Sequence, residues 1–242
     1  MSKRKRRRAD VHRKALFPEA GLDRPLGTGG ESTRLHEERL DTVTSVLRDT
    51  GARTVLDLGC GGGSLLKRLA EEDQFTRIVG IDTSIEALVE AERSLGAGAL
   101  QDERVSLRHA GFDTPDADLT GFDAAAMVET IEHIEPERLS IVERVVFAEW
   151  RPRVVVMTTP NREYNSLLGL EAGEPRHPDH RFEWDRQKFG SWAEGVAQRH
   201  GYEVRCDGIG PADPLRGCPT QIAVFRLPPA RDRPNDQRPE GE

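Results

Sequence analysis

Two carboxylates and one imidazole occur together directly after an apolar stretch of the chain. The segment VETIEHIE at residues 128–135 contributes Glu129, Glu132 and His133, and it follows the apolar segment at residues 122–128. In helical geometry the spacing i, i+3 and i+4 places side chains on one face, so we expect these three to point the same way. Their oxygen and nitrogen atoms are donors of the kind that bind divalent cations, and no thiolate is among them. The segment is therefore a candidate metal site.

A purely structural role for the same acids is the alternative. Pro136 restricts the residue before it and suits a first helical turn, so the next helix is expected to begin there. Carboxylates ahead of a helix stabilise its dipole by roughly 0.3–1 kcal/mol and often have no other role. That role does not require a histidine.

More imidazoles occur in the segment RHPDHRFEW at residues 176–184, which carries His177 and His180. This segment follows the fifth expected strand, and loops that follow parallel strands meet at the carboxyl edge of a sheet, where ligands bind. Two carboxylates and one or two imidazoles would then converge there. Carboxylates with open positions suit Mg²⁺ or Mn²⁺, and imidazoles shift the preference toward Mn²⁺, Fe²⁺ or Co²⁺, so we expect Mn²⁺. The alternative is a hydrogen-bonded structural loop.

A glycine-rich loop follows the first expected strand. In VLDLGCGGGSLL at residues 55–66, Gly59 and Gly61 allow a tight turn and close approach to a ligand, and Asp57 stands at the strand end. The next expected strand ends at Asp82, where an acidic side chain binds ribose hydroxyls in nucleotide-binding folds. The loop lacks the lysine of a triphosphate-binding loop. Loop and acid together favour a cofactor that contains adenosine, and an ordinary strand-to-helix turn is the alternative.

The elements that must position these residues alternate between short β-branched runs and helical patterns. Strands are expected at residues 54–59, 77–82, 104–109, 122–128, 153–159, 202–210 and 221–227. Helices are expected at residues 33–47, 84–95 and 138–150. Strands joined by helices form a parallel sheet covered on both faces, whereas the last two strands, joined without a helix, should pair antiparallel. The sequence predicts an α/β domain with a Rossmann-like seven-stranded sheet, mostly parallel with an antiparallel last strand and helices on both faces.

A length of 242 residues suits one such domain with short tails. We expect a folded domain at residues 31–228, a basic, flexible arm at residues 1–30 that contains KRKRRR, and a disordered tail at residues 229–242. The basic block is either a solvated tail or an arm for phosphate backbones, in a chain whose formal charge is −7. No apolar run reaches the roughly 20 residues of a membrane span, and the chain start lacks the apolar part of a secretory signal, so we expect a soluble, cytoplasmic protein.

The motifs on successive strands resemble those of class I S-adenosylmethionine-dependent methyltransferases. The matching segments are VLDLGCGGG, GIDTS and FDAAAMVE, in this order. The resemblance implies S-adenosyl-L-methionine as cofactor, with Asp57, Gly59 and Gly61 around its methionine part and Asp82 on its ribose. The segment HAGF at residues 109–112, with Gly111 and Phe112, would flank the adenine.

The two histidine-containing segments resemble one family, the small-RNA 3′-terminal 2′-O-methyltransferases of the Hua-enhancer type. Its patterns E-x-x-E-H and D-H-x-F-E-W are matched by VETIEHIE and RHPDHRFEW, and TTPNREYN and CPTQIAVFRL match further segments. The resemblance covers roughly residues 35–227. It implies that Glu129, Glu132, His133 and His180 bind Mn²⁺ or Mg²⁺, whereas His177 does not occupy a ligand position.

The same resemblance implies an activity. The bound metal would chelate the 2′ and 3′ hydroxyls of the last nucleotide of an RNA, and the 2′-hydroxyl would be methylated. His133 and Glu132 are the catalytic candidates, with His133 or a bound water as the proton acceptor. The RNA 3′ end is the expected partner, together with a protein of RNA repair or processing. Six basic residues near the expected site would suit phosphates, and surface solubility explains some of them equally well: Arg151, Arg153, Arg162, Arg176, Arg181 and Lys188.

Two other functions remain open from the sequence. A small-molecule O-methyltransferase would use the same fold and hold a catechol-like diol at the metal, and it would turn over without RNA. A non-catalytic RNA-binding subunit would bind through the basic arm and keep only a vestigial cofactor pocket.

Overall fold

The computed structural model describes residues 29–101 and 103–229. The expected basic arm at residues 1–30 and the expected tail at residues 229–242 therefore lie almost wholly outside the described residues, and residues 29 and 30 belong to the first helix. Within the described part, no helix combines the length and apolar character that crossing a membrane requires.

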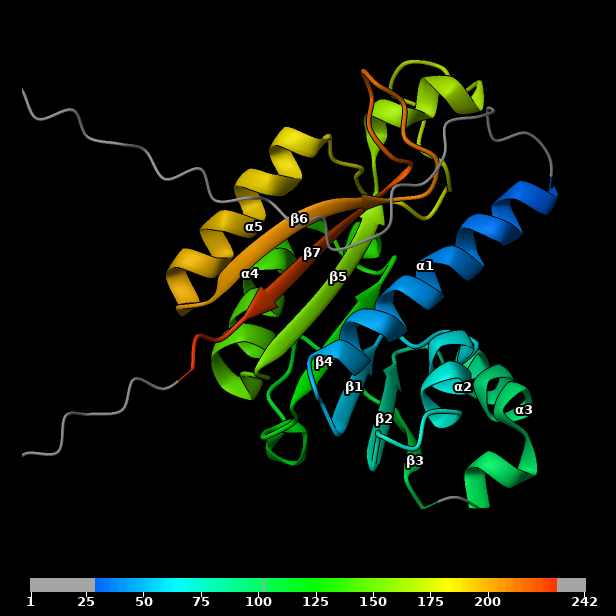
Figure 1. Ribbon diagram of the computed structural model, residues 1–242, viewed down its shortest axis with the longest axis vertical. Helices are drawn as coiled ribbons and strands as arrows, with labels where there is room; N and C mark the ends of the chain where they lie inside the picture. Colours follow the sequence, from blue (N-terminus) through cyan, green and yellow to red (C-terminus); the bar gives the residue numbers. More distant parts are fainter. Residues whose placement is uncertain (1–28, 102, 230–242) are drawn as a thin grey trace, which may run out of the picture.

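Seven strands form one sheet in the order β3-β2-β1-β4-β5-β7-β6 (Figure 1). Strand β7 runs antiparallel to both β5 and β6, and the remaining neighbours are parallel. This confirms the predicted fold class. The strands are β1 Thr54–Leu58, β2 Arg77–Asp82, β3 Val105–His109, β4 Ala124–Val128, β5 Val154–Pro160, β6 Glu203–Ile209 and β7 Thr220–Arg226.

The central strands are buried and mostly apolar because helices cover both faces of the sheet. In β1, Leu56 lies opposite Val79 of β2 and Ala125 of β4, and all three are buried. The described helices are α1 Gly29–Asp49, α2 Ser64–Ala70, α3 Ile85–Gln101, α4 Leu139–Glu143 and α5 Arg186–His200. Helices α1 and α2 pack on one face of the sheet, and α4 and α5 pack on the other.

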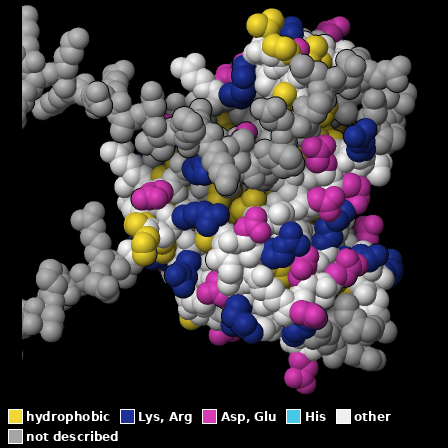
Figure 2. Space-filling model, viewed as in Figure 1, with side chains coloured by type: hydrophobic (Ala, Val, Ile, Leu, Met, Phe, Trp, Pro, Cys, Tyr) yellow, Lys and Arg dark blue, Asp and Glu magenta, His cyan; other side chains and the backbone are white. Residues whose placement is uncertain are grey.

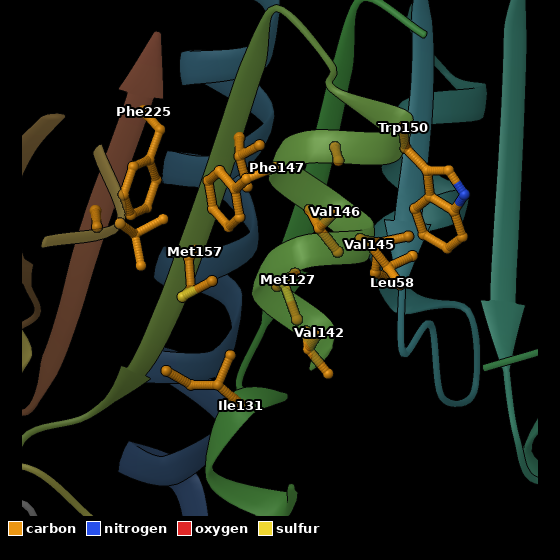
Figure 3. Packing of buried hydrophobic residues seen from close by; sticks show 14 of the residues in the cluster. Leu58, Met127, Ile131, Val142, Val145, Val146, Phe147, Trp150, Met157 and Phe225 are labelled. Atoms are coloured by element: carbon orange, nitrogen blue, oxygen red, sulfur yellow. The ribbon is translucent and has the colours of Figure 1, made fainter. Parts of the chain in front are cut away.

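The expected helix at residues 138–150 differs from the structure. A short 3₁₀ turn at Pro136–Arg138 leads into α4, which continues as a π-helical segment at Arg144–Trp150. That segment contributes Phe147 and Trp150 to the hydrophobic cluster that also contains Met127 and Met157 of the central strands (Figure 3). The start of the helical region at Pro136 agrees with the prediction.

The topology determines where a ligand can bind. The strand order reverses beside β1, since β2 lies on one side of it and β4 on the other. Ligands of open α/β sheets bind at such a switch point, outside the carboxyl ends of the strands. The glycine loop after β1, Asp82 at the end of β2 and the acidic segment after β4 all lie at this edge.

Candidate metal and cofactor site

The glycine loop turns tightly at the end of β1. Gly59 has a φ of +78°, and a Cβ there would lie 2.6 Å from the Thr130 side chain, so no larger residue fits without displacing Thr130. The amides of Gly59 and Cys60 both donate to the carbonyl oxygen of Ile81, at 2.9 and 3.0 Å. The loop is thereby fixed between β2 and the segment that follows β4.

Asp82 fixes the loop from the other side. Its carboxylate accepts hydrogen bonds from the amide of Gly61 at 2.9 Å and from the amide of Ser84 at 2.8 Å. One side chain thus connects the glycine loop to the start of α3. Asp82 still lines the neighbouring pocket, as expected for a residue that contacts a ribose.

A pocket of about 570 Å³ opens between these loops. Five of the six expected cofactor residues line it, namely Gly59, Gly61, Asp82, Gly111 and Phe112. The other residues that line it are Thr83, Asp113, Glu129, Thr130, His133, Ile134, Glu135, Arg138, Val142 and Arg181.

Asp57, the sixth expected cofactor residue, does not line the pocket. It is only 2% exposed and lies on β1 beneath the loop. Burial, and then the charge of Asp82, raise the pKa of its carboxyl group to about 7. Its Oδ2 is buried without a hydrogen-bond partner among the described residues. The contact with the cofactor that the resemblance implied stays a prediction.

Glu132, His133 and His180 come together beside the pocket. Each offers one ligand atom, and these atoms lie within 4.8 Å of one another. Glu132 and His133 belong to a 3₁₀ turn at Ile131–His133, and His180 lies 47 positions further along the chain. The imidazole centroids of His133 and His180 are 4.9 Å apart, and the amide of Arg181 donates to the carbonyl oxygen of Glu132 at 2.7 Å. The predicted convergence of the two segments is present.

Glu129 differs from its expected position. Its φ of 50° is left-handed, so it does not share a helical face with Glu132 and His133, and the helical turn begins only after it. Its amide donates to the carbonyl and hydroxyl oxygens of Thr158, at 3.1 Å each. The Glu129 carboxylate lines the pocket, but it forms an ion pair of 3.2 Å with Arg39 and does not belong to the group of three. Strained backbone of this kind is concentrated at functional sites.

The protonation of the cluster follows from its burial. Burial and the neighbouring Glu129 carboxylate hold the pKa of Glu132 well above its ordinary value. Glu132 Oε2 accepts from the Thr159 hydroxyl at 3.0 Å, whereas Oε1 is buried and has no partner among the described residues. Burial, and then the nearby His180, lower the pKa of His133, so its imidazole is neutral at pH 7.

These features fit a divalent cation. A buried carboxylate oxygen without a partner and two converging imidazoles form a donor set without thiolates, which suits Mn²⁺ or Mg²⁺. A second buried oxygen without a described partner, Glu129 Oε1, lies in the same region. A cation would also compensate the buried carboxylate charge.

His177 is exposed, and its ring centroid lies 6.1 Å from that of His133 and 5.7 Å from that of His180. It stays outside the group of three, in agreement with the expectation that it is not a ligand.

The basic residues near the site in sequence do not all lie there in space. Arg181 lines the pocket, but Arg151 and Arg153 precede β5 and so lie at the opposite edge of the sheet. Arg176 is largely buried and donates to the main-chain oxygens of Asn161 and Pro219, which is a structural role.

Two residues of the site were not recognised from the sequence. Arg39 reaches Glu129 from α1, and no local pattern connects residues 90 positions apart. Glu183 contacts His180, and its only sequence signal was its place in the segment RHPDHRFEW.

Comparisons with known proteins agree with this geometry. A sequence model described as a methyltransferase domain matches residues 56–148. The chain is 34% identical over 220 residues to a small RNA 2′-O-methyltransferase of Gallus gallus, an alignment that covers 84% of this chain and 58% of the relative. It is 36% identical over 201 residues to a protein of the same name from Xenopus tropicalis, covering 79% of this chain and 54% of the relative. The chain thus spans just over half the length of these curated relatives.

The structure is also similar to a solved domain over that domain's full length. The crystal structure of the methyltransferase domain of bacterial CtHen1-CN is 40% identical in sequence and superposes with a TM-score of 0.71. The match covers 80% of this chain and 100% of the solved chain.

Proposed function

Because the chain belongs to the family of small RNA 2′-O-methyltransferases, we propose that it methylates the 2′-hydroxyl of the 3′-terminal nucleotide of RNA, with S-adenosylmethionine as the methyl donor. The observation that carries this proposal is the convergence of Glu132, His133 and His180 beside the pocket formed by the glycine loop and Asp82. A methyl-donor pocket and a metal-binding donor set side by side suit a reaction at a hydroxyl group.

The pocket supports an adenosine-containing cofactor. Asp82 stands where it would accept hydrogen bonds from ribose hydroxyls, while its bonds to Gly61 and Ser84 keep it in place. Gly111 and Phe112 line the same pocket and would border the adenine. Asp57 lies buried beneath the loop with its Oδ2 lacking a described partner, and its contact with the methionine part of the cofactor stays a prediction.

Glu132, His133 and His180 would hold the divalent metal, with Glu129 as a further ligand once its carboxylate turns from Arg39. The donor set favours Mn²⁺, with Mg²⁺ second. When bound, such a cation supplies Lewis-acid activation of a hydroxyl group that is a poor nucleophile at neutral pH, and two vicinal hydroxyls are the group it would orient.

The chain's own residues would orient the RNA end and receive the proton. His133 lines the pocket and its pKa is lowered, which favours a neutral imidazole with a single unprotonated ring nitrogen. That nitrogen would either hold the metal or accept the proton that the 2′-hydroxyl releases, and where it holds the metal a water would accept the proton. Glu132 lies behind it, fixed by Thr159 and by Arg181. Methyl transfer requires the hydroxyl oxygen in line with the sulfonium, so the rigid attachment of this turn to β5 contributes directly to positioning.

The proposal is tested with a short RNA that carries a free 3′-terminal diol, incubated with methyl-labelled cofactor and Mn²⁺. We expect one methyl group per RNA and resistance of the product 3′ end to periodate, because methylation removes the vicinal diol. Activity that persists in chelator would remove the metal from the mechanism. Methylation of a catechol instead of RNA would favour a small-molecule enzyme, and RNA binding without any methyl transfer would favour a non-catalytic subunit.

A protein of RNA repair or processing remains a predicted partner. A partner that presents the RNA end is a further part of the proposal. Co-purification of a ligase or nuclease with the full chain would test it.

A further inference from the structure

The Nδ1 atom of His180 is already engaged. It lies 2.5 Å from Oε1 of Glu183, and both side chains are almost fully buried, at 8% and 2% exposure. A carboxylate oxygen can only accept, so this contact assigns the ring proton to Nδ1. The other nitrogen, Nε2, is then left as the unprotonated donor of His180.

Glu183 is itself held by two further contacts. The amide of Arg176 donates to Oε1 at 2.7 Å, and the side-chain amide of Asn165 donates to Oε2 at 2.5 Å. Arg176 Nε in turn donates to Asn165 Oδ1 at 2.6 Å, and its guanidinium donates to the carbonyl oxygen of Pro219 at 2.8 Å. The carboxylate is therefore fixed to the segment after β5 and to the start of β7.

This chain of contacts has the form of a support for a metal-binding histidine. A ligand imidazole usually donates its second N–H to a carboxylate, which selects the tautomer and the ring orientation. A buried carboxylate needs hydrogen-bond donors in any role, so the specific feature is that one of the three donors on Glu183 is the ring nitrogen of a histidine in the cluster.

We propose, on the premise of the function above, that Glu183 is a positioning residue that fixes the tautomer and orientation of His180, and that Asn165 and Arg176 hold Glu183 in place. Glu183 touches neither substrate nor cofactor. It acts by keeping Nε2 of His180 unprotonated and aimed at the place shared with Glu132 and His133.

The first measurement determines the tautomer of His180 in the metal-free protein from the ¹⁵N chemical shifts of its ring. The His180 signals are identified as those that disappear in His180→Gln. The wild-type protein should show the Nδ1–H form. Glu183→Ala should shift the ring toward a mixture of tautomers, whereas Glu183→Gln, whose carbonyl oxygen still accepts from Nδ1, should retain the Nδ1–H form.

The second measurement is Mn²⁺ affinity, from the electron paramagnetic resonance signal of free Mn²⁺. Glu183→Ala should weaken binding by about 10–100-fold, the loss typical for a removed outer partner of a metal ligand. Glu183→Gln should lose much less Mn²⁺ affinity. Glu163→Gln is the matched control, because Glu163 pairs with Arg186 at the same sheet edge and does not contact His180.

If Glu183→Ala does not fold, Asn165→Ala replaces it as the test variant. Asn165→Ala removes only the hydrogen bond to Oε2 of Glu183. It should therefore weaken Mn²⁺ binding by less than the loss expected for Glu183→Ala. A folded Glu183→Ala, or Asn165→Ala in its place, with wild-type tautomer and wild-type Mn²⁺ affinity would overturn the proposal. A wild-type protein that binds no Mn²⁺ would instead contradict the proposed function, and the tautomer measurement would still decide the role of Glu183.

Discussion

Asp57 and Glu132 are carboxyl groups of the site that lie inside the protein, at 2% and 0% exposure. Burial is the largest cause of the raised pKa in both, and a neighbouring carboxylate adds to it. Their surroundings differ, because Glu132 lies beside two imidazoles while Asp57 lies on β1 beneath the glycine loop.

Asp57 should make the stability of the protein depend on pH. Its folded-state pKa of about 7 lies above its ordinary value, so its contribution is fully present below about pH 4 and is lost as pH rises through 7. Asp57→Asn removes this loss, so the variant should gain free energy of unfolding relative to wild type, by on the order of a few kcal/mol, as pH rises from 4 to 8. Urea unfolding of both proteins at several pH values measures it, and parallel pH profiles would contradict it.

Removing a cluster ligand should separate turnover from cofactor binding. Neither Glu132 nor His180 lines the pocket, so Glu132→Ala and His180→Ala should bind S-adenosylmethionine within a few-fold of wild type. Mn²⁺-dependent methyl transfer should fall by more than about 100-fold, since even outer partners of metal ligands cost about 10–100-fold. Calorimetry with the cofactor and a labelled-methyl assay measure the two effects. Equal losses in both would show that the cluster belongs to the cofactor pocket.

At the scale of elements, α1 contributes a charge to the site from outside the sheet. Arg39 is almost fully buried, and its guanidinium donates to the Thr220 hydroxyl of β7 at 3.1 Å while pairing with Glu129 after β4. The helix that precedes the sheet in sequence thus connects two strands at the site. Breaking a buried pair by removing one partner costs more than the pair itself contributes.

Arg39→Met should therefore destabilise the protein by about 3 kcal/mol, because it leaves the Glu129 carboxylate half-buried without a countercharge. Adding Glu129→Gln should restore most of the loss, since no uncompensated charge remains. Urea unfolding of the two single variants and the double variant gives the coupling energy. Additive effects in this cycle would show that the ion pair does not couple the two elements.

The sequence predicted the elements better than their local geometry. All seven strands were predicted, because β-branched and apolar runs such as VVVMTT and AAAMV are typical of buried strands. The loops that follow these strands then located the carboxyl edge of the sheet. The convergence of Glu132 and His133 with His180 was also predicted. The left-handed Glu129 was not, because its conformation depends on hydrogen bonds to Thr158 of a strand distant in sequence. The π-helical segment at Arg144–Trp150 likewise has no signature in the apolar spacing.

On the scale of the whole molecule, the charged side chains can be located relative to the pocket. The face in front in Figure 2 carries Lys and Arg side chains mixed with Asp and Glu, so it offers no extended field of one sign. The carboxyl edge carries the pocket, and the described basic residues that line it are Arg138 and Arg181. These are paired with Asp113 and Glu135, which line the same pocket.

Arg181→Ala should raise the KM for RNA several-fold while leaving cofactor affinity unchanged, because an arginine at the pocket mouth is placed to contact a phosphate next to the terminal nucleotide. Arg153→Ala is the control, since Arg153 is exposed at the opposite edge of the sheet. Steady-state kinetics of both variants at fixed salt give the comparison. An equal effect of the two substitutions would indicate a general electrostatic contribution rather than a contact at the site.

The central claim is that the Glu132, His133 and His180 cluster acts on the terminal diol of RNA beside the methyl donor. The most direct test is methyl transfer, with and without Mn²⁺, to short RNAs that are identical except for the last sugar. We predict Mn²⁺-dependent methylation of the RNA that ends in a 2′,3′-diol, and a large loss for the RNA whose last sugar lacks the 3′-hydroxyl. The RNA whose last sugar lacks the 2′-hydroxyl should not be methylated at all. Equal methylation of the diol and 2′-deoxy RNAs, or undiminished activity without a divalent metal, would contradict the account.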